Sequence, residues 1–103
     1  ESAPKSKEQK RREAEARNRA YAALKGHRKR IAELDKLLEK DNARMDEIMA
    51  LLADPDFYVN EAASSDVIAE HARLKQRISA EEEEWFVLNE ELEEELKKQQ
   101  EAL

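Results

Sequence analysis

The stretch Leu51-Leu52-Ala53-Asp54-Pro55-Asp56-Phe57-Tyr58 decides the fold, because it separates two long helical repeats. Proline has no amide hydrogen and disfavours helix in the residue before it, so the first helix should end near Asp54. Pro55 suits the first position of a short helical turn. The stretch therefore predicts a helical hairpin, with a helix to about residue 53, a hinge over 54–65 and a second helix from about residue 66.

The hinge also contains candidate packing and capping residues. The apolar residues 57–59 should fold back over the end of the hairpin and cover Leu52 and Ile68. Ser64 or Ser65 can cap the second helix, because a serine hydroxyl accepts a hydrogen bond from a free amide of the first turn.

Apolar residues recur every seven positions on both sides of the hinge. Before it they are Leu24, Ile31, Leu38, Met45 and Leu52. After it they are Val67, Leu74 and Leu88 in one row, and Ile78, Trp85 and Leu92 in the other. Heptads sustained over this length are typical of a coiled coil. The predicted fold is all-α: an antiparallel two-helix coiled-coil hairpin over 21–103, preceded by a basic linker or helical extension over 1–20.

A second row of the first helix, three positions after the first, consists of His27, Leu34, Asp41 and Ile48. Antiparallel pairing of these rows predicts a register for the seam between the helices. In it Asp41 lies opposite Glu81, and His27 lies opposite Glu95. Polar residues at seam positions can specify register at some cost in stability. Trp85 lies in the apolar row, so core packing is favoured over a ligand-stacking role.

Composition excludes several classes of protein. Of the 103 residues, 43% are charged and 5% aromatic, which fits long helices better than a globular core. The absence of cysteine excludes disulfides and thiolate metal sites, and a single glycine excludes a phosphate-binding loop. We expect no catalysis, no metal, no membrane span and a cytoplasmic location. Because the chain opens with Glu1, we also expect it to be a piece of a longer protein.

Charge is distributed unevenly along the chain. Residues 1–30 hold 11 Lys/Arg against 4 Asp/Glu, whereas the other 73 residues hold 8 against 21. A basic segment of this kind is typical of contacts with nucleic-acid phosphates. The candidate nucleic-acid-binding residues are Lys5, Lys7, Lys10, Arg11, Arg12, Arg17, Arg19, Arg28, Lys29 and Arg30, and Lys25 lies within the same segment. Gly26 is either a hinge behind this segment or a tolerated exposed glycine.

Three stretches together resemble one family. They are the basic segment over 6–15, the hinge over 52–58 and the closing Glu83-Glu84-Trp85-Phe86-Val87-Leu88-Asn89-Glu90-Glu91-Leu92-Glu93. The chain resembles the C-terminal coiled-coil extension of the ABC-F subfamily of ATP-binding cassette ATPases, over nearly its whole length. Some members have an aromatic residue in the basic motif, of the kind Ser-Tyr-Lys-Glu, whereas here Ser6 is followed directly by Lys7. That departure argues against base stacking on single strands.

The resemblance implies a non-catalytic accessory domain that contacts DNA or ribosomal RNA, with the ribosome and the ATPase domains of the parent chain as partners. It implies ATP and magnesium only in those ATPase domains, and no cofactor in this fragment. The alternative is a structural coiled-coil module that packs on its own ATPase domains or dimerises.

Overall fold

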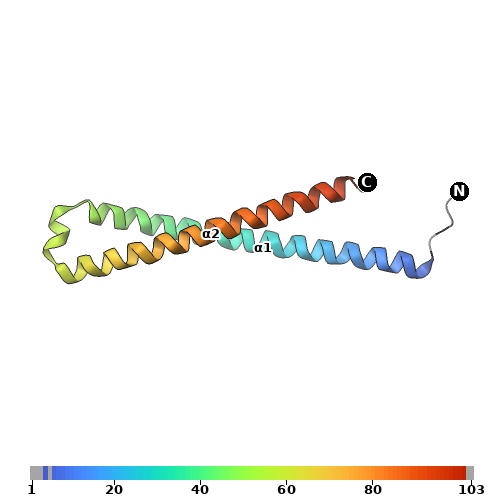
Figure 1. Ribbon diagram of the computed structural model, residues 1–103, viewed down its shortest axis with the longest axis horizontal. Helices are drawn as coiled ribbons and strands as arrows, with labels where there is room; N and C mark the ends of the chain where they lie inside the picture. Colours follow the sequence, from blue (N-terminus) through green and yellow to red (C-terminus); the bar gives the residue numbers. More distant parts are fainter. Residues whose placement is uncertain (1–3, 5, 102–103) are drawn as a thin grey trace.

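The computed structural model describes residue 4 and residues 6–101. Helix α1 spans Lys7–Leu52, the short 3-10 helix η1 spans Pro55–Val59, and helix α2 spans Glu61–Glu101. Figure 1 shows α1 and α2 as an antiparallel pair that crosses near its middle, with η1 at one end and both chain termini at the other. The hairpin measures 83 × 20 × 15 Å. The predicted all-α hairpin is confirmed.

Helix α1 begins and ends at residues with clear capping roles. The Ser6 hydroxyl accepts a hydrogen bond from the Gln9 amide at 3.1 Å, so the basic extension starts with a proper N-cap. The helix then continues without a break through residue 20 to Leu52. Its end agrees with the prediction made from Pro55, because Asp54 already has an extended backbone.

Helix α2 begins earlier than the sequence predicts, at Glu61 and not near residue 66. The Asn60 side chain accepts a hydrogen bond from the Ala63 amide at 3.1 Å and thus caps the helix. Ser64 lies inside the helix, where its hydroxyl donates to the Glu61 carbonyl. The predicted serine cap is wrong because asparagine is an equally good N-cap and lies four residues closer to the turn.

The turn between the helices exposes more apolar surface than predicted. Phe57 is half-buried and packs edge-on against Tyr58, with ring centroids 6.0 Å apart. Val59 is 83% exposed and Ile68 is 49% exposed, so residues 57–59 do not cover the hairpin end as a group. Five residues in a 3-10 helix cannot direct three consecutive side chains to one side.

The seam holds the buried residues at the predicted heptad positions. Leu34 and Ile48 of α1 are fully buried, Leu74 of α2 is 1% exposed and Leu24 is 5% exposed. Burying such a side chain contributes about 1.5–3 kcal/mol. Trp85 is only half-buried, and its indole nitrogen donates to the Asp35 carboxylate at 2.8 Å. The tryptophan therefore packs at the edge of the seam and not at its centre.

Two carboxyl side chains are buried inside the seam. Asp41 is 3% exposed and Glu81 is 9% exposed, and the two carboxyl groups lie against each other as predicted. Arg77 donates two hydrogen bonds to Asp41, at 3.0 and 2.8 Å, and holds the pKa of that carboxyl below its ordinary value. Burial, and then the neighbouring Asp41, raise the pKa of Glu81.

Candidate nucleic-acid interface

The basic segment of α1 covers residues 7–30, and all its cations except Arg30 are exposed. Lys10 and Arg17 lie fourteen and seven positions before Leu24, so cations continue the row that forms the apolar seam elsewhere. Both side chains are exposed, and α1 extends past the end of α2 (Figure 1). The seam row is thus converted into a cationic surface at this end of the hairpin.

Most of these cations form no ion pair with the other residues that the structure describes. Arg12 pairs with Glu8 at 2.7 Å, and Arg11 approaches Glu15 at 3.7 Å, both across one helical turn. Exposed pairs of this kind are weak and are easily exchanged for a phosphate. Within the described residues, no ion pair involves Lys10, Arg17, Arg19, Lys25, Arg28 or Lys29. Lys5 lies outside the described residues.

Arg30 differs from the other candidate residues, because its guanidinium is engaged within the hairpin. It donates to both carboxylate oxygens of Glu84, at 2.6 and 2.9 Å, and to Glu33 at 3.3 Å. This two-pronged contact raises the pKa of Arg30 and lowers that of Glu84. Arg30 therefore joins the two helices, and we do not include it in the candidate interface.

A second arginine, nearer the turn, makes the same two-pronged contact with a glutamate of α2. Arg44 donates to both oxygens of Glu70 at 2.7 Å and to Glu47 at 2.8 Å. The two arginines stand fourteen positions apart on α1, and so do Glu70 and Glu84 on α2. The signal in the sequence is the repeated Arg-x-x-Glu of Arg30 and Arg44 at a two-heptad spacing, which a count of charges alone does not reveal.

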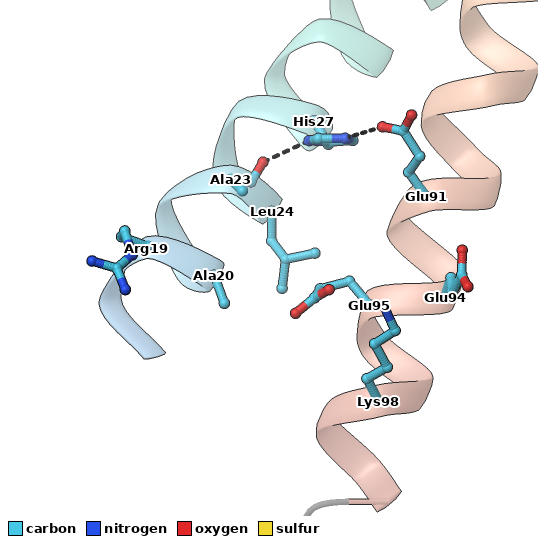
Figure 2. A pocket seen from close by; sticks show the side chains of 9 residues that line it. All are labelled: Arg19, Ala20, Ala23, Leu24, His27, Glu91, Glu94, Glu95 and Lys98. Atoms are coloured by element: carbon cyan, nitrogen blue, oxygen red, sulfur yellow. Dashed lines mark hydrogen bonds and ion pairs between the residues drawn. The ribbon is translucent and has the colours of Figure 1, made fainter. Parts of the chain in front are cut away.

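A shallow wedge of about 420 Å³ opens between the helices at the end that carries the termini (Figure 2). His27 points across it, with Nδ1 2.7 Å from the Ala23 carbonyl and Nε2 2.6 Å from a Glu91 oxygen. Glu95, which the register places opposite His27, also lines the wedge, and in Figure 2 its carboxylate lies near Leu24. The His27–Glu91 contact repeats the Asp41–Arg77 contact two heptads along each helix, so the packing repeat selects Glu91.

Both basic and acidic side chains line the wedge. Both ring nitrogens of His27 face oxygen acceptors, an arrangement that only the doubly protonated imidazolium satisfies. The hydrogen bond to Glu91, followed by that to Ala23, raises the pKa of His27. Arg19 and Lys98 also line the wedge. Among residue 4 and residues 6–101, no group of three His, Cys, Asp or Glu side chains is placed to hold a metal ion.

The comparison with protein families matches residues 24–90 to the family described as ABC transporter C-terminal domain. The match covers 67 of the 103 residues. The chain belongs to this family. Searches of curated proteins and of solved structures find no match.

This ABC transporter C-terminal domain is matched over the hairpin from Leu24 onward, which is where the apolar seam begins. The basic residues 7–19 precede the matched part. The domain is thus an accessory, C-terminal part of an ABC protein. In the part of the chain that the structure describes, neither helix has an apolar stretch that would cross a membrane.

Proposed function

We propose that this ABC transporter C-terminal domain is the accessory domain of an ABC-F ATPase and contacts nucleic acid through the basic segment of α1. The ABC-F assignment is supported by the resemblance of the hinge over 52–58 and of the stretch around Trp85. DNA and ribosomal RNA both present the phosphates that such a segment binds. The role is one of attachment, without chemistry in this domain.

One observation carries the proposal: the unpaired, exposed cations at one end of an otherwise acidic molecule. Arg17, Arg19 and Arg28 present guanidinium groups, which match the geometry of phosphate oxygens. The net charge is +7 over residues 6–30 and negative over the rest of the hairpin. A polyanion is therefore attracted to the α1 end and repelled by α2, so the hairpin points away from the bound strand.

Binding should depend on salt and only weakly on sequence. Phosphate contacts release counterions, and contacts to the backbone carry little sequence information. If five phosphates of duplex DNA are engaged, the slope of log K against log salt should be about −4.5.

The test replaces five cations of the segment, Arg11, Arg12, Arg17, Arg19 and Arg28, with Gln. The matched control replaces five cations outside it: Lys36, Arg73, Lys75, Lys97 and Lys98. Anisotropy titrations use a ribosomal RNA fragment, duplex DNA and a single strand, and circular dichroism checks helicity. We expect the first variant to bind more weakly and with a flatter salt slope. The control should keep the affinity and the salt slope of the unchanged chain.

The competing function is a structural module that packs on the ATPase domains or dimerises. The family match favours it in one respect, because the match begins at Leu24 and leaves out residues 7–19. Binding that is undetectable at low salt, or equal in the two charge variants, would support that function and reject ours. Changes at seam residues alone would then affect the parent protein.

A further inference from the structure

The end of the hairpin opposite the termini, which we call the tip, comprises residues 45–72. It contains no Lys or Arg. Its acidic residues are Asp46, Glu47, Asp54, Asp56, Glu61, Asp66 and Glu70. Arg44, just outside this range, binds two of them, Glu47 and Glu70. The other five leave a strongly negative surface on the turn and on the adjacent ends of α1 and α2.

The tip also exposes large apolar side chains. Val59 is 83% exposed, Met49 is 53% exposed and Tyr58 is 45% exposed. Val59 and Tyr58 belong to η1, and Met49 lies in the last turn of α1. Exposed apolar groups gathered at one end of a molecule and bordered by charge are typical of interaction sites.

The turn that carries Val59 is held in place by several hydrogen bonds. The Asp54 carboxylate accepts from the Asp56 amide at 3.0 Å. The Tyr58 hydroxyl donates to the Leu52 carbonyl at 2.7 Å and ties η1 to the end of α1. On the far side Asn60 caps α2. Val59 is thus presented from a turn fixed on both sides, which lowers the conformational entropy lost on binding.

We propose that the tip is a docking site for a protein surface that carries basic groups around an apolar recess. Val59 enters the recess, while Asp54, Asp56 and Glu61 face the basic rim. Charge complementarity identifies the class of partner, because acidic groups without a cation repel nucleic acid and attract Lys and Arg. This inference goes beyond the proposed function and uses the opposite end of an 83 Å molecule.

The test uses the isotope-labelled chain and two peptides of equal positive charge. One places leucine at every third or fourth position among lysines, so that it forms an amphipathic helix, and the other has serine in place of leucine. We expect the Lys/Leu peptide to shift the NMR signals of residues 54–61 and to bind about tenfold more tightly than the Lys/Ser peptide, since burying one valine is worth about that factor. Binding should weaken as salt screens the acidic rim.

Two matched variants separate the tip from general acidity. Val59→Ser should remove the preference for the Lys/Leu peptide, whereas Phe86→Ser should retain it, because Phe86 is a 58% exposed apolar residue on the acidic part of α2. Both side chains are exposed, so neither change should alter the fold. Shifts centred on 81–94, or equal affinity for the two peptides, would overturn the proposal. Tip signals that shift with protein concentration alone would identify a second copy as the occupant and would also overturn it.

Discussion

At the tip, the turn that joins α1 and α2 is fixed by hydrogen bonds to the Asp54 and Asn60 side chains. At the other end, α1 continues alone past α2. Seam residues show the same contrast. Ile48, within the tip, is completely buried, and Leu24, the first apolar residue of its row, borders the wedge. The difference indicates that packing energy is concentrated toward the tip, and that the basic segment depends on local helix stability.

The largest expected effect compares one truncation in each half. Ile48→Ala should reduce the free energy of unfolding by about 2–5 kcal/mol, because a completely buried side chain leaves a cavity. Leu24→Ala should cost less, since solvent already reaches the wedge beside it. Urea denaturation followed by circular dichroism measures both. Equal losses would mean that the two halves are packed equally well.

The buried carboxyl pair at mid-seam provides the next test. Replacing Asp41 and Glu81 together by Leu should stabilise the hairpin by about 1–4 kcal/mol, because desolvation of a buried ionic group often exceeds what its partners return. One oxygen of Glu81 has no hydrogen-bond partner among the described residues, which adds to that cost. Unfolding curves measure the gain, and sedimentation checks whether the helices still pair within one chain. A loss of stability would show that the Arg77 contact outweighs desolvation.

A smaller gain is expected at Gly26, in the weakly packed half. A methyl group added there would meet no atom within 4 Å apart from the adjacent backbone of its own helix, and the residue lies inside α1. Gly26→Ala should therefore stabilise the helix by roughly 0.5–1 kcal/mol through its better helix propensity. Amide exchange of residues 20–30 should slow, while that near the tip stays unchanged. If nucleic-acid affinity fell in this variant, Gly26 would act as a hinge after all.

The smallest effect concerns pH at the wedge. The pKa of His27 is raised in the folded chain, so its contribution to stability is complete below about pH 6.5 and is lost as the pH rises through the raised value. Amide protection near His27 should fall over that interval. His27→Gln should abolish the change, while His71→Gln, a replacement outside the wedge, should keep it. Identical pH profiles for all three chains would contradict the role of the His27–Glu91 contact.

The heptad rows predicted the hairpin and the burial of Leu34, Ile48 and Leu74, because a seven-residue repeat marks the side of a helix that faces its partner. The start of α2 was missed because Asn60, Ser64 and Ser65 are all acceptable caps, and the choice depends on how tightly the turn closes. The hydrogen bond of His27 to Glu91 was missed because heptad pairing identifies the opposite residue, Glu95, and not the neighbour one turn away that the ring reaches.

Candidate-site residues were predictable only as a set of charges. Lys10, Arg17 and Arg28 are exposed as a basic segment requires, but charge alone does not distinguish them from Arg30. The guanidinium of Arg30 is bound by Glu84, which is 54 residues away in the chain. A contact between residues so distant in sequence depends on the register of the two helices, and the register is set by the packing of the whole seam.

Helix α1 is uninterrupted from Lys7 to Leu52, so the angular position of every cation is fixed relative to the seam. Each residue advances a helix by about 100° and 1.5 Å. One residue inserted between Arg19 and Leu24 would therefore rotate the preceding cations by more than a quarter turn about the axis, while leaving the net charge unaltered. Seven inserted residues would restore the original direction and only lengthen the arm. Related domains of this kind should thus tolerate insertions here in whole heptads and reject single ones.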